Sequence, residues 1–385
     1  MITIANGTVL YGIDLIAKNT NILIDDGKII EISENVVEGE IIDATDCIVC
    51  PSFLNAHTHI GDSIVKDIGD AKSIDEIVKP PNGLKHIALK ESSKDDLIDS
   101  MKSTMWDMIE TGTTHFIDYR EGGVEGVKLL KKAARDIPIN PIILGRDNIF
   151  FDEDSDLSKV KIIIRKLLKV CDGIAPSGFG EITDEVAILI ASECEKKGKI
   201  SSIHAGEHDA SQIDSLEKTE KTEIQRGIDC GFNQLVHIVS PYNNDLDLIA
   251  KSNINIVSCP RSNGAFSVGI PPLLDILERG IKPLIGTDNV MINSPNIFRE
   301  LEYTLKIMRA FYETYISPKD ILKMATTNVN MNANIKTKIN KSIIQEENFA
   351  ELFIAKKISK NPYLSLINRS ETKDIIYSMN KDKLI

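Results

Sequence analysis

The sequence predicts an α/β protein, in which a (β/α)8 TIM barrel is flanked by a small β-sandwich domain built from both ends of the chain. Two observations carry this prediction. Between residues 51 and 335, apolar runs of strand length alternate with segments of helical period, giving about eight strand–helix units. Before and after this region, short strand-like runs occur without such helices. We therefore expect a composite β domain of residues 1–50 and 336–385, and a barrel of residues 51–335.

The composition is that of an ordinary globular protein. The chain has 385 residues, of which 42% are hydrophobic and 26% charged. Its net charge of −12 argues against a nucleic-acid partner, because phosphate binding needs a basic surface. No apolar run approaches the roughly 20 residues of a membrane-spanning helix, and no secretory signal pattern is present. Six scattered cysteines fit a reducing compartment, so the expected location is the cytoplasm.

Both ends of the chain show strand signals. Asn21–Ile24 and Lys28–Ile32 flank a short Asp-Asp-Gly turn, which is typical of a β-hairpin. Near the other end, Asn348–Ala355 and Asp374–Met379 have strand-like patterns. Neither end has enough apolar residues for a core of its own, so we expect the two ends to pair.

The barrel is predicted to begin with the apolar run Ile48–Leu54. A helix capped by Ser92 or Ser93 follows and ends at Gly112. Further helices alternate with the remaining strands, and Ile297–Thr314 would cover the barrel after the last one. The later strands are predicted at Thr113–Asp118, Pro141–Gly145, Gly173–Pro176, Lys199–Ile203, Gln234–Val236, Ile254–Val257 and Lys282–Ile285.

Histidine and aspartate residues follow several of these strands. His57 and His59 come after the first one, and side chains at i and i+2 of an extended segment point to the same face. His204, His237 and Asp288 follow three later strands, where a barrel carries its functional groups. Nitrogen and oxygen donors of this kind suit zinc, and also Fe(II) or Mn(II). Each residue taken alone could be an ordinary core histidine or turn aspartate, but together they predict a metal site.

Several segments together resemble the amidohydrolase superfamily, and within it the cytosine-deaminase-like and chlorohydrolase-like enzymes. The resemblance covers nearly the whole chain. It implies that His57, His59, His204 and Asp288 bind one divalent metal ion per chain. It also implies that His237 contacts the metal-bound water or the substrate, and that Glu207 is the acid–base residue. The segments are Asn55-Ala-His57-Thr-His59, His204-Ala-Gly-Glu207, His237, Ser258-Cys-Pro-Arg-Ser-Asn263 and Gly286-Thr-Asp288-Asn289.

Elementary chemistry agrees with these roles. Zinc lowers the pKa of bound water to about 7, and Asp288 beside that water could accept its proton. Glu207 could carry a proton to a ring nitrogen and then to departing ammonia. The fourth strand end, Ile174–Gly180, has no lysine that could bridge two metals, so we expect a single ion. One departure from the family pattern is Lys338–Ser342, which replaces a Gly-rich segment.

These residues predict a metal-dependent hydrolase that deaminates an amino-substituted heterocycle of purine, pyrimidine, pterin or triazine type. The same site could instead hydrolyse a cyclic amide or another non-peptide C–N bond. A barrel that only binds a small molecule would have no need of Glu207 as a proton carrier. Of the remaining polar residues, Arg146 and Asn263 are candidate substrate contacts, with a structural salt bridge as the alternative for Arg146. The sequence leaves open whether the chain forms a homo-oligomer.

A rival motif occupies part of the same segment. His204-Ala-Gly-Glu207-His208 satisfies the His-x-x-Glu-His pattern of inverted zinc peptidases. That pattern needs a helix, whereas Lys199–Ile203 has a strand pattern and Gly206 disfavours a helix. We therefore expect the peptidase interpretation to fail.

Overall fold

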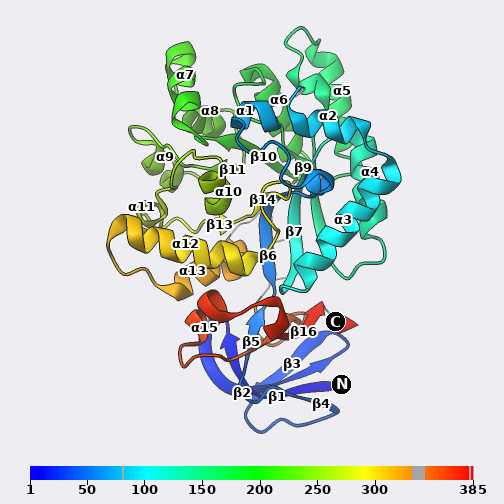
Figure 1. The fold of residues 1–385 in the computed structure, drawn as a ribbon, viewed down its shortest axis with the longest axis vertical. Coiled ribbons are helices and arrows are strands. Elements are labelled where there is room, and N and C mark those ends of the chain that lie inside the picture. Colours follow the sequence, from blue (N-terminus) through cyan, green and yellow to red (C-terminus); the bar gives the residue numbers. More distant parts are fainter. Residues whose placement is uncertain (80–81, 332–342, 381–382, 385) are drawn as a thin grey trace.

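The computed structural model describes residues 1–79, 82–331, 343–380 and 383–384. Its strands form two separate sheets, and Figure 1 shows one below the other with both chain termini on the lower sheet. None of the described helices is long and apolar enough to cross a membrane.

The upper sheet is a ring of parallel strands, which confirms the barrel-like α/β domain. The order of its strands is β13-β12-β11-β10-β9-β8-β7-β6-β14. β13 and β14 are two short pieces on either side of residues 286–287; β13 pairs with β12, whereas β14 pairs with β6. The ring therefore closes through a broken eighth strand. The strands are β6 (Phe53–His59), β7 (Thr113–Arg120), β8 (Asn140–Gly145), β9 (Gly173–Ile174), β10 (Ile200–Ala205), β11 (Gln234–His237), β12 (Asn255–Ser258), β13 (Leu284–Ile285) and β14 (Asp288–Asn289).

Helices join these strands and surround the ring (Figure 1). As predicted, Ser93 caps the first of them, because its side chain accepts a hydrogen bond from the backbone N–H of Asp96. The helices between strands are α3 (Lys94–Ile109), α4 (Gly123–Ala134), α5 (Leu157–Leu167), α6 (Asp184–Glu195), α7 (Asp209–Thr219), α8 (Glu223–Asp229), α9 (Asp245–Lys251), α10 (Pro260–Ala265) and α11 (Leu273–Glu278). After the ring come α12 (Ile297–Tyr312), α13 (Pro318–Met324) and η3 (Thr327–Met331).

Two further insertions lie on the ring. The segment between β6 and α3 folds into the short helices η1 (Ile60–Val65), α1 (Ile74–Val78) and α2 (Leu84–Glu91). A single helical turn, η2 (Asn148–Phe151), follows β8. The first insertion places Lys85 beside Asp62, which lies shortly after β6, and beside Glu121, which directly follows β7.

The lower sheet combines strands from both ends of the chain in the order β17-β16-β15-β5-β1-β2-β3, with β4 also paired to β1. β15 lies between β5 and β16, so the two ends do pair. Whether this sheet is a sandwich, and whether the domain borders fall at residues 50 and 335, stay predictions; the second border and Lys338–Ser342 lie outside the described residues. The elements are β1 (Ile2–Tyr11), β2 (Ile16–Asp25), β3 (Lys28–Ser33), β4 (Glu40–Asp43), β5 (Cys47–Pro51), β15 (Glu351–Lys356), α15 (Pro362–Arg369), η4 (Thr372–Asp374), β16 (Ile375–Asn380) and β17 (Lys383–Leu384).

One predicted strand is wrong in its limits. The apolar run Ile48–Leu54 is divided between β5 of the lower sheet and β6 of the ring. Its two halves have different hydrogen-bond partners: β5 pairs with β15 and β1, whereas β6 pairs with β7 and β14. As a consequence His57 and His59 lie inside β6 instead of following a strand.

Candidate metal centre and active site

Four predicted metal ligands meet at the carboxyl ends of the ring strands. His57 and His59 come from β6, His204 from β10 and Asp288 from β14. The Nε2 atom of His57 lies 3.3 Å from Nε2 of His204 and 3.0 Å from Oδ1 of Asp288. The Nε2 atom of His59 lies 3.4 Å from the same Asp288 oxygen. Three elements far apart in the sequence thus direct their donor atoms to one point.

Local sequence explains why the strand that bears Asp288 can come so close to β6. A Cβ atom on Gly286 would lie 2.6 Å from the backbone nitrogen of His57, so only glycine fits there. Beside it, the Asn55 side-chain amide donates to Thr287 Oγ1 (2.7 Å) and accepts from the Thr287 backbone N–H (3.0 Å). The Gly-Thr-Asp segment therefore fixes the eighth strand against the first.

Two of the site residues have unusual backbone conformations. His237 has φ 80° and Asp288 has φ 61°, in the left-handed region that non-glycine residues seldom adopt. Such conformations cost free energy and persist where the surrounding structure fixes them, often at functional sites. In this protein they turn both side chains toward the cluster.

Burial keeps the imidazoles neutral. It lowers the pKa of His59 to about 3, with Lys85 acting in the same direction. Burial also lowers the pKa of His57, against the effect of Asp288, and lowers that of His204 well below its usual value. Although burial raises the pKa of Asp288, the neighbouring His57 and His59 hold it well below the usual range. The cluster thus offers three neutral nitrogen donors and one carboxylate.

This donor set fits a divalent metal ion. Two neutral imidazole nitrogens 3.3 Å apart gain nothing from facing each other unless a proton or a cation lies between them. A zinc ion with bonds of roughly 2.1 Å to tetrahedral ligands separates those ligands by about 3.4 Å, which is close to the spacings seen here. The predicted metal-binding side chains are therefore compatible with one shared ion. Three groups of side chains each have ligand atoms within 4.8 Å of one another: His57 with His59 and His204, His57 with His237 and Asp288, and His204 with Glu207 and His237.

Glu207 and His237 lie on the cavity side of this cluster. Oε1 of Glu207 is 3.6 Å from Nε2 of His237. Burial raises the pKa of Glu207 to about 7, although His237 acts to lower it. A carboxyl group with a pKa near neutrality can both take up and release a proton at physiological pH, as a general acid–base residue must.

Asn263 holds the other edge of the His237 ring. Its side-chain oxygen lies 3.0 Å from Nδ1 of His237, so that nitrogen is the one that bears the proton and donates. Asn263 is buried and does not line the cavity. Its predicted contact with substrate stays a prediction, and the structure gives it a place behind His237.

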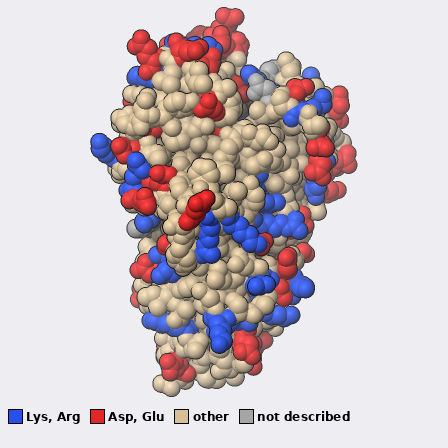
Figure 2. Space-filling view, turned by 60° about the vertical axis from the view of Figure 1, so that its left-hand side comes forward, with Lys and Arg blue, Asp and Glu red and all other residues tan. Residues whose placement is uncertain are grey.

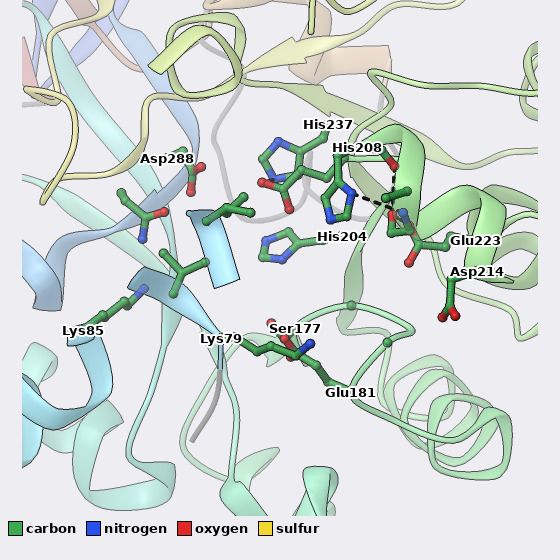
Figure 3. A pocket seen from close by; sticks show the side chains of 18 of the residues that line it. Lys79, Lys85, Ser177, Glu181, His204, His208, Asp214, Glu223, His237 and Asp288 are labelled. Carbon is green, nitrogen blue, oxygen red and sulfur yellow. Dashed lines mark hydrogen bonds and ion pairs between the residues drawn. The ribbon is translucent and has the colours of Figure 1, made fainter. Parts of the chain in front are cut away.

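The cluster lies at the wall of a cavity of about 400 Å³, within the range of small-molecule sites. Figure 3 shows His204 and His237 next to each other, Asp288 on one side of them and Glu223 on the other. Ser177 and Glu181, from the loop after β9, line a further part of the wall. Lys79 and Lys85 line it as well, so both signs of charge are present around the cavity, which suits a polar substrate.

Arg146, the other predicted substrate contact, lines the cavity but is engaged in an ion pair. Its Nη2 atom lies 2.7 Å from Oε1 of Glu121, the residue that follows β7. Lys85 also lines the cavity and lies 2.8 Å from the same oxygen. Glu121 and Lys85 were not predicted from the sequence. Neither belongs to a local motif, although the position of Glu121 directly after a predicted strand end was an available signal.

Tyr119, near the end of the second ring strand, packs against the histidine cluster. It lies below the cluster on β7, with its ring centre 4.0 Å from that of His57 and stacked on His204 at an interplanar angle of 14°. Its hydroxyl group contacts Ser202 (2.5 Å) and Gln234 (2.8 Å). Tyr119 therefore packs against two of the imidazoles, and its hydroxyl contacts hold its ring in place.

The peptidase interpretation of His204–His208 fails, as expected. His204 lies in β10, Gly206 has φ 62°, and His208 is the residue that caps α7. The two histidines do not share the face of one helix, which that motif requires.

A parallel barrel that gathers imidazoles and a carboxylate at the carboxyl ends of its strands has the architecture of a metal-dependent hydrolase. Residues 48–358 match the Amidohydrolase family, and the chain belongs to that family, which confirms the predicted resemblance. It is 47% identical over 386 residues to a protein of Methanothermobacter thermautotrophicus provisionally named an aminohydrolase, covering 100% of this chain and 99% of that relative.

Two other proteins extend the comparison. The chain is 25% identical over 329 residues to a 5′-deoxyadenosine deaminase of Methanosarcina acetivorans, covering 81% of this chain and 74% of the relative. The crystal structure of atrazine chlorohydrolase from Arthrobacter aurescens, complexed with zinc, is 16% identical with a TM-score of 0.84, covering 100% of this chain and 95% of the other. The latter similarity shows a shared fold.

Proposed function

We propose that this protein is a metal-dependent deaminase, which replaces an exocyclic amino group of a nitrogen heterocycle by oxygen and releases ammonia. One observation carries the proposal: His57 lies 3.3 Å from His204 and 3.0 Å from Asp288, and His59 lies 3.4 Å from the same Asp288 oxygen. Glu207 lines the same cavity as His59, His204 and Asp288. A binding module would need neither the ligand cluster nor a carboxyl group whose pKa is near 7.

The proposed roles follow from these positions. His57, His59, His204 and Asp288 would hold a divalent ion, which when bound would lower the pKa of a water molecule to about 7 and so supply a nucleophile at neutral pH. Glu207 carries one proton of the attacking water to a ring nitrogen. It then carries the second, released as the carbon–oxygen double bond forms, to the amino group, which departs as ammonia. His237, with Nδ1 fixed by Asn263, presents Nε2 toward the reacting atoms. Asp288 Oδ2 accepts a hydrogen bond from Ser262 Oγ at 2.6 Å, which leaves Oδ1 for the cluster.

We further propose that the heterocycle is a purine and that the ion is zinc, one per chain. The 5′-deoxyadenosine deaminase among the relatives supports the first choice, and zinc in the structurally similar chlorohydrolase supports the second. Three imidazoles with a carboxylate are also compatible with Fe(II) or Mn(II).

The proposal also covers the partner of the protein, its location, its oligomeric state and the form of the terminal sheet. The partner is a small-molecule substrate rather than nucleic acid, since acidic and basic side chains are interspersed on the face shown in Figure 2. We retain the cytoplasm as the expected location, homo-oligomerisation as an open possibility, and a sandwich arrangement of the terminal sheet.

The test is ammonia release. Protein stripped of metal and reloaded with zinc should release ammonia from at least one compound in a panel of aminopurines, aminopyrimidines, aminopterins and aminotriazines, with adenine nucleosides included. The double variant His57→Ala, His59→Ala should lose both the bound ion and the activity, because two of four ligands are gone.

Three results would count against the proposal. Product from a cyclic amide without ammonia would favour ring-opening hydrolysis by the same site. Stoichiometric metal binding without turnover of any compound of either kind would remove the support for a hydrolase. Two ions per chain would contradict the mononuclear site.

A further inference from the structure

Glu121 is a buried carboxylate in contact with three cationic side chains. It follows β7 and is 9% exposed. Its Oε1 atom lies 2.8 Å from Lys85 Nζ and 2.7 Å from Arg146 Nη2, and its Oε2 atom lies 2.6 Å from Arg120 Nη2. Three cations around one buried carboxylate fix its position far more firmly than a single ion pair could.

The same carboxylate faces the outer edge of a proposed metal ligand. Oε1 of Glu121 lies 3.4 Å from Nδ1 of His59, while Nε2 of that ring is the atom 3.4 Å from Asp288. A carboxylate at Nδ1 favours the tautomer that is protonated there, so that the lone pair of Nε2 is available to a metal.

We propose that Glu121 is a positioning residue for the metal centre: it orients His59 from behind, while Lys85, Arg120 and Arg146 hold Glu121 in place. This inference rests on the proposed function for the identity of the ligands. It assigns Arg146 to the support of the metal site, where the sequence left both substrate binding and a structural salt bridge open.

The support extends to the strand that bears Asp288. Lys85 Nζ lies 3.3 Å from Asp62 Oδ2, and that oxygen accepts a hydrogen bond from Asn289 Nδ2 at 2.7 Å. The other Asp62 oxygen accepts from the Met291 backbone N–H at 2.9 Å. Lys85, on α2, therefore joins the carboxylate behind His59 to the residue that follows Asp288.

Close packing maintains this arrangement. A Cβ atom on Gly61 would lie 2.0 Å from Nη2 of Arg120, so glycine at this position leaves the space that the guanidinium occupies. Asp118 Oδ1 accepts from the Ile60 backbone N–H at 2.7 Å and fixes the turn directly after His59. The chain directly before Glu121 is thus tied to the segment that contains the ligand.

The experiment measures metal affinity instead of activity. The zinc dissociation constant of Glu121→Gln is determined by competition with a chromophoric chelator, and the visible spectrum of the cobalt(II) form is recorded. We expect zinc binding to weaken by about 10–100-fold, as for other supports of metal-bound histidines, and the cobalt spectrum to change. Glu121→Asp, which keeps the charge, should restore part of the affinity.

The chain offers a matched control. Glu193 on α6 is 3% exposed and, like Glu121, is paired with an arginine and a lysine, Arg165 at 2.7 Å and Lys196 at 2.8 Å. It does not line the cavity. Glu193→Gln should therefore leave the zinc dissociation constant and the cobalt spectrum unchanged.

Wild-type affinity and an unchanged cobalt spectrum in Glu121→Gln would overturn the inference and leave Glu121 a structural ion-pair residue. If that variant does not fold, Lys85→Met receives the same measurements, and unchanged zinc affinity there would also count against it. Failure of the wild-type protein to bind one ion would instead refute the proposed function, so the two failures are distinguishable.

Discussion

Glu207 differs in kind from the neighbouring side chains at the site. The proposed ligands are linked by distances of 3.0–3.4 Å, whereas Oε1 of Glu207 lies 3.6 Å from His237, which is not one of the four. Because Glu207 is outside the proposed ligand set, we expect that its carboxyl group can be altered without loss of the ion.

Replacement of Glu207 by Gln should therefore separate proton transfer from metal binding. The variant keeps the size of the side chain but cannot exchange a proton, so turnover should fall by roughly 10²–10⁴-fold. Metal content should stay at the wild-type level. Steady-state kinetics on the substrate found by the ammonia screen, together with metal analysis, would measure both.

Glu217→Gln is the control for this experiment, since Glu217 is an exposed residue on the nearby helix α7. It should behave as wild type. Near-normal turnover of Glu207→Gln would show that Glu207 is no more than a cavity-lining acid.

Among the elements, the broken eighth strand has a strict steric requirement. Gly286 separates β13 from β14 and lies against the backbone of His57, where a Cβ atom would be 2.6 Å away. Because backbone atoms cannot move aside as a flexible side chain can, an alanine here would force β6 and β14 apart.

Gly286→Ala should lower the free energy of unfolding by about 1–3 kcal/mol, the usual cost of overpacking. Its zinc affinity should fall as well, since His57 and Asp288 would separate. Urea denaturation and chelator competition would measure the two effects. Gly180→Ala is the control, because its Cβ atom meets nothing within 4 Å, and it should be neutral or stabilising by up to about 1 kcal/mol.

Helix α12 contains a buried acid that should make stability depend on pH. Glu300 is fully buried, and burial raises its pKa to about 7 from the usual 4.5, against the opposing effect of Arg261. Between these two pKa values the folded chain holds a proton that the unfolded chain has released. Stability is therefore greatest below the unfolded pKa and is lost as the pH rises through the folded one.

Glu300→Gln should remove this part of the dependence, which is on the order of 3 kcal/mol for a shift of this size. Glu207, whose pKa is also raised to about 7, contributes with the same sign in both proteins. The comparison of urea denaturation at pH 5 and pH 8 isolates Glu300. Equal pH dependence in the two proteins would show that Glu300 is ionised in the folded state.

The whole molecule is joined where Phe353 of the terminal sheet meets the barrel. Phe353 on β15 is fully buried and lies 4.8 Å, centre to centre, from the ring of Phe53 on β6. It also lies 5.9 Å from Phe298 on α12. One aromatic cluster therefore connects both sheets and a covering helix, so we expect the two sheets to unfold together.

Phe353→Ala should lower the free energy of unfolding by about 3–5 kcal/mol while leaving a single transition. The one tryptophan, Trp106 on α3, reports on the barrel, and circular dichroism reports on the whole chain. Both signals should shift to lower urea concentration together. Phe311→Ala, at a position 57% exposed, should change stability by no more than about 0.5 kcal/mol. Separate transitions for the two signals would indicate independent domains.

The sequence alone was sufficient to predict the features that depend on local pattern. Alternating strand and helix periods indicated the barrel, and the positions of His57, His59, His204 and Asp288 near strand ends predicted that they would meet. Side-chain direction in a strand follows from its period of two, and parallel strands bring their carboxyl ends to one edge. Both rules apply to any parallel barrel, so they can be used without knowing which residues are in contact.

The tertiary structure decided what depends on contacts between distant segments. The apolar run Ile48–Leu54 has one continuous pattern, and it is divided at Ser52 because its two halves find hydrogen-bond partners in different sheets. Glu121 and Lys85 have no shared motif in the sequence. They meet because a buried carboxylate needs cations within reach, and only the folded chain determines which cations those are.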